Sequence, residues 1–270
     1  MTINAQDISM RVVGGVLKHP LPPDPGDFWS AGFGFENGAV GAECLPLWDT
    51  GNNNEISADQ AYKGTKSCKM SVSLGGENWG GGYDLAGQGR QLFQDDEVWF
   101  RIATYFPAGF NMDVQPAGGS RLKFIRVKQH LSGGAFDGHF DMQFKDDASA
   151  ISIGLEKSWP TFVDIANTAV VFDTWQVWEI YFYFDWRPAD DALGNGRIRI
   201  WLDDALKIDK TDQPTLIRAG NQIIDFPIFS SWNTGSPATQ HCYVDGGRVT
   251  NGNPGSFDAS GNPFIGKDAP

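Results

Sequence analysis

Apolar and polar residues alternate along several segments in the middle of the chain. In "VWEIYFYFDW", residues 177–186, the apolar Trp178, Ile180 and Phe182 share one parity and Glu179 lies on the other. Such alternation indicates a strand with one buried face, because successive side chains point to opposite sides of a sheet. The same alternation predicts further half-buried antiparallel strands at residues 97–107, 121–130, 138–147 and 196–204.

These strands, separated by turns rich in glycine, predict an all-β protein with one domain over residues 28–251. No segment combines a long helical period with capping residues. Residues 1–27 are expected to form an N-terminal arm, because the four prolines of "HPLPPDPGD" disfavour helix and central strand. Residues 252–270 are rich in Gly, Pro, Asn and Asp and are expected to form a loosely ordered C-terminal tail.

The polar parity of the predicted strands is also rich in aromatic residues. Residues 177–186 carry two tyrosines beside Glu179, and residues 196–204 carry Arg197, Arg199 and Trp201 on the matching face. Aromatic rings stack on the apolar faces of sugars, while charged groups bond to the hydroxyls. One such strand is compatible with an ordinary solvent-facing surface, but several strands with the same pattern favour a carbohydrate-binding groove.

The composition narrows the classes of partner. The formal net charge of −12 argues against a nucleic-acid partner, which requires a basic surface. An acidic polysaccharide requires the cations to be gathered in one cleft. No segment approaches the roughly 20 apolar residues of a membrane span, so no membrane partner is expected.

The three cysteines, Cys44, Cys68 and Cys242, have neither zinc-ligand nor redox spacing, and their odd number favours buried free thiols. The first twenty residues lack the apolar run of a signal peptide. We therefore expect cytoplasmic synthesis, and both release from the cell and association with a virion are left open.

The order of several segments resembles the jelly-roll polysaccharide lyases, including the glucuronan- and alginate-lyase-like families. The segments are "DEVWFRIATYFPAGFN", "LKFIRVKQ", "FDTWQVWEIYFYFDW", "GNGRIRIWLDD", "FSSWNTG" and "YVDGGRVT", and the resemblance covers roughly Phe28 to Asn251. It implies a concanavalin-like β-jelly-roll sandwich of two antiparallel sheets with a concave substrate groove. The chain lacks the "QIH"-type strand of the alginate lyases.

The chemistry that this resemblance implies is β-elimination at a uronic acid. A Tyr or His removes the C5 proton, and cationic or amide groups neutralise the carboxylate. Residue types that match the catalytic roles are Tyr181, Tyr183, His139, Arg199 and Arg101, with Arg126 as a further cation, and the choice of base is left open. Candidates for substrate binding are Glu179, Trp201, Lys123, Lys128, Tyr105, Tyr243, His241 and, in a glycine-rich loop, Trp79.

A structural calcium ion is a further expectation. The segment "FGFENG" resembles the first strand of many carbohydrate-binding β-sandwiches, in which a Glu and a late Asp hold calcium. The matching residues here are Glu36 and Asp245, and carboxylate oxygens suit this cation. An ordinary solvated turn is the alternative. No organic cofactor is expected.

Three functions are compatible with the sequence. The first is a lyase acting on a polysaccharide that contains uronic acid, and the second is a non-catalytic carbohydrate-binding or virion-attachment sandwich. The third is a structural sandwich whose aromatic face packs on a partner subunit. Asp137 and Asp141, four residues apart beside His139, offer a weaker alternative as a carboxylate pair for glycoside hydrolysis. The oligomeric state is left open.

Overall fold

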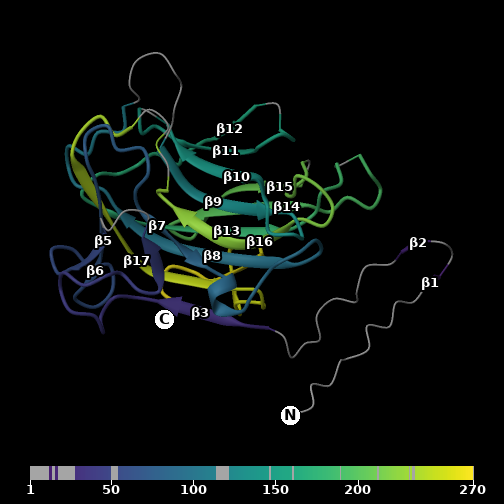
Figure 1. Ribbon diagram of the computed structural model, residues 1–270, viewed down its shortest axis with the longest axis horizontal. Coiled ribbons are helices and arrows are strands. Elements are labelled where there is room, and N and C mark those ends of the chain that lie inside the picture. Colours follow the sequence, from purple (N-terminus) through teal and green to yellow (C-terminus); the bar gives the residue numbers. More distant parts are fainter. Residues whose placement is uncertain are drawn as a thin grey trace, which may run out of the picture.

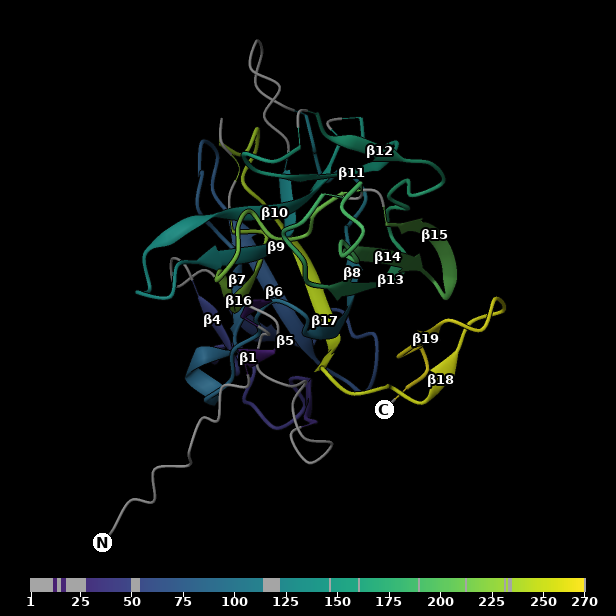
Figure 2. The ribbon, with the colours of Figure 1, turned by 90° about the vertical axis from the view of Figure 1, so that its right-hand side faces the viewer.

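The computed structural model describes residues 12–13, 16–17, 28–49, 54–113, 122–145, 147–159, 161–188, 190–211, 213–230, 232 and 235–269. Two large antiparallel sheets pack face to face, which confirms the predicted all-β jelly-roll sandwich (Figures 1 and 2). Within the described part of the chain, no helix is long and apolar enough to cross a membrane.

The predicted N-terminal arm, residues 1–27, lies largely outside the described residues. Only two short strands of it are described, β1 (Val12–Val13) and β2 (Val16–Leu17), and they pair with each other.

The first sheet has seven strands and contains two of the predicted segments, residues 121–130 and 138–147. Its order brings the early strands of the chain beside late ones. From edge to edge the strands are β12 (Val163–Ile165), β11 (Ile151–Leu155), β10 (Phe136–Phe144), β9 (Leu122–His130), β16 (Gln222–Ile228), β7 (Gly81–Asp84) and β4 (Leu47–Asp49).

The second sheet has eight strands, of which seven form its main order, and it contains the other three predicted segments. Strand β3 (Ser30–Phe33) pairs with β17 outside that order. From edge to edge the strands are β15 (Ala205–Lys210), β14 (Arg197–Leu202), β13 (Trp175–Tyr183), β8 (Glu97–Tyr105), β17 (Gln240–Thr250), β6 (Ser67–Val72) and β5 (Asn54–Ser57).

Aromatic side chains fill the space between the two sheets. Trp178 and Phe182 on β13 point inward, as their parity predicts, and are fully buried. Such ring pairs add about 0.5–1.5 kcal/mol each beyond the area they bury. Pairs that join one sheet to the other are Phe124–Trp178 (centroids 5.5 Å apart), Phe140–Phe182 (4.9 Å), Phe144–Trp178 (5.8 Å) and Phe100–Phe226 (5.2 Å).

The C-terminal residues are packed, contrary to the expectation of a loosely ordered tail. Strands β18 (Ser256–Phe257) and β19 (Pro263–Phe264) form a small hairpin, which lies beside β13 and β14 in Figure 2. Ile265 is 1% exposed, because the segment lies against the outer face of the eight-stranded sheet. We call residues 256–269 the C-terminal segment.

The cysteines correct a second expectation. Cys44 and Cys68 form a disulfide, with Cα atoms 5.7 Å apart, and only Cys242 is a free thiol. The sequence spacing carried no sign of this bond, because Cys44 reaches Cys68 only through the folding of the first strands. Such a bond stabilises a fold mainly by restricting the unfolded chain.

Thiol counting checks the pairing. Unfolded protein without reductant should expose one reactive thiol per chain, and reduction should raise the count to three. Native protein should expose none, because Cys242 is fully buried. The measurement is titration with a chromogenic disulfide reagent, and three thiols in unreduced, unfolded protein would contradict the disulfide.

Candidate functional site

Charged and polar side chains cover the outer face of the seven-stranded sheet. On β10, Phe140 and Met142 belong to the core, so His139, Asp141 and Gln143 between and beside them point outward. We call the outward side chains of this sheet the polar face, meaning Lys123, Arg126, Lys128, His130, His139, Asp141, Gln143, Glu156 and Asp225.

An irregularity in β9 brings two cations together on this face. The pairing of β9 with β10 shifts by one residue, so that Phe124 and Ile125 both enter the core. A bulge of this kind changes the side-chain parity beyond it. Strict alternation would place Lys123 on the face opposite Arg126, whereas the structure places both beside Asp141.

Asp141 is the centre of this charged cluster and is only 1% exposed. Its Oδ1 accepts a hydrogen bond from Arg126 Nε at 2.5 Å, and its Oδ2 lies 3.7 Å from Lys123 Nζ. Burial lowers the pKa of Lys123, and the charge of Asp141 opposes that shift. The cluster therefore holds two cations in a poorly hydrated setting, where their fields act strongly on a bound anion.

His139 and Glu156 form a second element of the face. The backbone N–H of His139 donates to Glu156 Oε2 at 3.0 Å, and Nδ1 of the ring lies 3.5 Å from the same oxygen. We infer that Nδ1 carries the proton toward this carboxylate, which leaves the lone pair on Nε2. Burial lowers the pKa of His139, although Glu156 opposes the shift, so the imidazole is neutral at neutral pH. Arg126 Nη2 lies 3.7 Å from the other oxygen of Glu156.

A third group lies where β16 meets β9. Lys128 Nζ lies 3.4 Å from Asp225 Oδ2, and the two residues are cross-strand partners. Burial raises the pKa of Asp225, and Lys128 opposes the shift. His130 lies two residues further along β9 than Lys128. Its Nδ1 atom is 2.9 Å from the carbonyl oxygen of Gly134.

Several buried polar atoms on this face have no hydrogen-bond partner among the described residues. A buried donor or acceptor left without a partner costs about 1–3 kcal/mol, so native structures keep few of them. Four of the nine such atoms among the described residues lie on this face, which is compatible with a surface that binds a polar ligand. These atoms are His130 Nε2, His139 Nδ1 (whose contact with Glu156 is at the limit of hydrogen-bond length), Gln143 Nε2 and Asp225 Oδ1.

The structure divides the predicted site residues between two opposite faces of the sandwich. Lys123, Lys128 and His139 lie on the polar face, together with Arg126. The predicted residues on the outer face of the eight-stranded sheet are Tyr181, Tyr183, Arg199, Arg101, Glu179, Trp201, Tyr105, Tyr243 and His241. One groove cannot contain both sets, because the whole core separates them.

The C-terminal segment covers much of this second face. Trp99 Nε1 donates to the carbonyl oxygen of Pro263 at 2.9 Å, and Phe264 stacks on Trp201 with centroids 5.9 Å apart. Tyr181 is 6% exposed and Trp201 is 1% exposed as a result. Burial and the neighbouring Glu97 raise the pKa of Tyr181, which makes this phenol a poor base. Tyr181 is therefore not exposed in an open groove, and the buried Arg199 donates from Nε to Asp209 Oδ2 at 3.2 Å. The catalytic roles of Tyr181, Arg101 and Arg199 stay predictions.

Glu179 and Arg101 bind the main chain of the C-terminal segment. Glu179 accepts hydrogen bonds from the backbone N–H of Ile265 at 2.5 Å and of Gly266 at 3.0 Å. Arg101 Nη1 donates to the carbonyl oxygens of Gly266 at 2.6 Å and Ala269 at 2.9 Å. Burial raises the pKa of Glu179 to about 7, against the effect of these donors. The carboxylate noted among the aromatic residues of β13 thus holds the chain's own C-terminal segment.

The other predicted aromatic residues on this face contact one another. Tyr105 packs edge-on against Tyr243 at 5.9 Å and lies 5.5 Å from Trp175. His241 packs against Tyr243 at 5.3 Å. The hydroxyl group of Tyr183 donates to Asp95 Oδ1 at 3.4 Å. None of these contacts joins them to the polar face.

Trp79 is not a stacking residue on the surface, which corrects another expectation. It is 0% exposed and stacks on Phe229 in the core with centroids 5.2 Å apart. The glycine-rich loop enters the core because Gly80 has φ +67° and a Cβ there would lie 2.4 Å from the carbonyl oxygen of Ile228. Glycine allows this close approach of two backbones.

Glu36 and Asp245 both hold the loop at residues 62–66. Glu36 accepts hydrogen bonds from the N–H groups of Thr65 and Lys66, and Asp245 Oδ2 accepts those of residues 62 and 63 at 3.0 Å each. Their oxygens thus face donors, which does not fit a shared cation. Among the described residues, no group of three or more His, Cys, Asp or Glu could hold a metal. The calcium ion stays a prediction.

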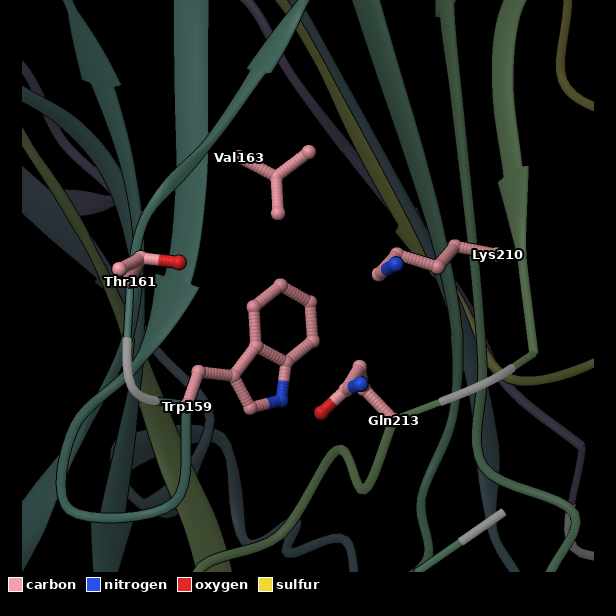
Figure 3. A pocket seen from close by; sticks show the side chains of 5 residues that line it. All are labelled: Trp159, Thr161, Val163, Lys210 and Gln213. Atoms are coloured by element: carbon pink, nitrogen blue, oxygen red, sulfur yellow. The ribbon is translucent and has the colours of Figure 1, made fainter.

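A small hollow lies elsewhere, between the free edges of the two sheets at β12 and β15. Figure 3 shows the Trp159 ring with Thr161 and Val163 on one side and Lys210 and Gln213 on the other. Its volume is about 90 Å³. Because its lining contains one lysine and no histidine or carboxylate, the polar face is the better candidate site.

Sequence reasoning missed part of the polar face. Glu156 and Asp225 were not recognised, because they reach the face from the end of β11 and from β16, which is distant in sequence. Asp141 was considered only with Asp137, but Asp137 is paired with Arg218 Nε at 2.7 Å. Charged residues within alternating strands were the only available signal, and they do not reveal which strands are neighbours.

The comparisons with known proteins agree on the fold. No family model matches the chain, and no curated protein matches it by sequence. Solved structures match at low identity, so they show the fold of the jelly-roll polysaccharide lyases and nothing finer.

Three of these structures illustrate the match. The endo-β-1,4-glucuronan lyase of the fungus Trichoderma reesei has a TM-score of 0.53 and 12% identity, covering 79% of this chain and 94% of that one. A mutant of the alginate lyase Aly36B in complex with alginate trisaccharide has a TM-score of 0.53 and 14% identity, covering 82% and 97%. The alginate lyase vAL-1 from Chlorella virus has a TM-score of 0.51 and 11% identity, covering 74% and 90%.

The buried Glu179 predicts a pH-dependent stability. Its pKa near 7 in the folded protein exceeds the ordinary 4.5, so the folded state binds more protons than the unfolded state between these values. The contribution of Glu179 to the free energy of unfolding should therefore fall by up to about 3 kcal/mol as the pH rises from 4.5 to 7. Urea unfolding of the parent and Glu179→Gln at pH 5 and pH 8 measures this change.

Glu55→Gln, on the exposed edge strand β5 of the same sheet, is the matched control. A stability difference between parent and Glu179→Gln that stays constant with pH would contradict the burial of this carboxyl.

Proposed function

We propose that the protein is a polysaccharide lyase that cleaves a uronic-acid-containing polysaccharide by β-elimination on the polar face. The observation that carries the proposal is the neutral His139, oriented by Glu156 and beside Arg126. A positioned neutral base next to cations is what removal of a proton α to a carboxylate requires. The fold shared with glucuronan and alginate lyases supports the same conclusion.

His139 supplies the base in the proposed reaction. Nε2 takes the proton from C5 of the uronate, and the C5–H electron pair forms the C4=C5 double bond as the C4–O4 bond breaks. The imidazolium formed is stabilised by Glu156, and its proton passes to the departing O4. The products are an unsaturated uronate at one new chain end and a free hydroxyl at the other. No tyrosine is required, and none of the six tyrosines belongs to the polar face.

Arg126 and Lys123 supply the positive charge. Negative charge spreads onto the uronate carboxylate as the C5 proton leaves, and cations placed before the reaction stabilise that charge. Arg126 Nη1 donates to no acceptor among the described residues, so it is available to a carboxylate. Asp141 holds both cations at this position and limits their attraction for solvent anions.

A non-catalytic glycan-binding protein is the second candidate. The observation that favours it is the charge balance, because each of the cations Lys123, Arg126 and Lys128 is already paired with a carboxylate. Such a surface would bind sugar hydroxyls without promoting proton removal. Retained glycan binding without any cleavage product would establish this class.

An absorbance assay tests the lyase. Mixing the protein with uronate polymers should produce a rise near 235 nm, the absorbance of the unsaturated product. His139→Gln should lower kcat at least about 100-fold, because it removes the base. His241→Gln, on the opposite sheet face, is the matched control and should keep the parent rate. Equal rates in the parent and His139→Gln would reject the assignment of the base.

The pH profile offers an independent check. His139 acts only when neutral, and burial holds its pKa below the ordinary 6.5, so activity should rise with pH along an acidic limb whose midpoint lies below 6.5. The measurement is kcat/KM from pH 4.5 to 8, which reports the free enzyme. An acidic limb centred above pH 6.5 would argue against a buried neutral imidazole as the base.

A further inference from the structure

An exposed aromatic ring lies at one end of the polar face, next to the proposed base. Phe136 is 52% exposed, and its ring packs on that of His139 with centroids 4.7 Å apart and on that of His130 at 6.1 Å. A large apolar ring exposed beside buried polar groups is the usual element on which a pyranose stacks.

His130 presents a hydrogen-bond acceptor beside this ring. A carbonyl oxygen can only accept, so the 2.9 Å contact of Nδ1 with Gly134 O places the ring proton on Nδ1. Nε2 then presents a lone pair. That atom is buried and has no partner among the described residues, and the residue is only 7% exposed.

Asp225 presents a second acceptor. Its Oδ2 faces Lys128, whereas Oδ1 is buried and has no partner in the described part of the chain. On the sheet, Asp225 pairs with Lys128, and His130 lies two residues further along β9 on the same face. Diagonal neighbours of this kind have Cβ atoms about 7 Å apart, which is within the span of the hydroxyl groups of one sugar residue.

Two acceptors require a ligand that donates hydrogen bonds. Hydroxyl groups of any sugar residue can donate to both, whereas an ionised carboxylate can donate to neither, so the two acceptors disfavour a carboxylate placed against them. The cross-strand neighbour of Asp225 on β7 is Asp84, so a second carboxylate lies beside the pair that Asp225 forms with Lys128. By contrast, Lys123 and Arg126 are balanced by Asp141 and Glu156 at the proposed reaction centre.

We propose that Phe136, His130 and Asp225 form a subsite for an uncharged sugar residue, adjoining the uronate that is cleaved. The proposal rests on the proposed lyase function and names its substrate class. The substrate is then a heteropolysaccharide in which a uronate adjoins a neutral sugar, in contrast to polymers of uronate alone.

The test compares two kinds of polymer. Hyaluronan and gellan place neutral sugars beside glucuronate, whereas glucuronan contains glucuronate alone. The parent should have the higher kcat/KM on one of the mixed polymers. Asp225→Ala and Phe136→Ala should each lower that value about tenfold or more, because a hydrogen bond to a charged group or a stacked ring is lost. The loss should be larger on the mixed polymer than on glucuronan, so the ratio of the two kcat/KM values should fall.

Matched controls come from the opposite sheet. Asp59→Ala removes an exposed carboxylate, and Phe257→Ala removes an exposed ring in the C-terminal segment. Both should behave as the parent on every polymer. Thermal unfolding of each variant verifies that it is folded. Equal or greater activity on glucuronan, with no effect of Asp225→Ala on the ratio of the two polymers, would overturn the subsite while leaving the lyase standing.

Direct binding separates the two proposals. Suppose no polymer gives a 235 nm signal, but calorimetry detects hyaluronan or gellan oligosaccharides binding to the parent and not to Asp225→Ala. The subsite then stands and the lyase fails. If neither oligosaccharide binds, or if both bind equally to parent and variant, the subsite is rejected.

Discussion

The packing of aromatic side chains between the two sheets determines which side chains of each strand lie on the outer faces of the sandwich. Phe124 and Phe140 of one sheet meet Trp178 and Phe182 of the other, and an inward ring turns its strand neighbours outward, except at the bulge of β9, where Phe124 and Ile125 both enter the core. Because a strand has only two sides, the core fixes both outer faces at once. A change in register by one residue would bury charged groups and expose the rings, so the pairing is strongly specified.

The two outer faces of the sandwich differ in their side chains and in what covers them. The face of the eight-stranded sheet is aromatic and is closed by the C-terminal segment, whose backbone bonds to the buried Glu179 and Arg101. The face of the seven-stranded sheet carries ion pairs, a neutral histidine and polar atoms without partners. Both faces contain residue types that suit sugars, but in the described part of the chain the buried polar atoms without a partner that lie on an outer face belong to the second. Its chemistry, and not the fold alone, supports the proposed lyase.

The polar face contributes little to the free energy of unfolding. Buried ion pairs such as Arg126–Asp141 gain little over apolar packing, and each unpartnered buried acceptor reduces the free energy of unfolding. The aromatic core and the Cys44–Cys68 disulfide offset this loss elsewhere. Arrangements of this kind persist where binding or catalysis requires the groups to be fixed before the ligand arrives.

The sequence by itself determined the strands and their inward faces. Period-two alternation located β8, β9, β10, β13 and β14, and it correctly turned Trp178 and Phe182 to the core, because alternation is a local property of the chain. It could not show which sheet each strand joins, so His139 and Tyr181 were predicted in one groove although the core separates them. It could not show the bulge that places Lys123 beside Arg126, the docking of the C-terminal segment on Glu179, or the partner of Cys68. These depend on contacts between residues far apart in the sequence, and only the tertiary structure decided them.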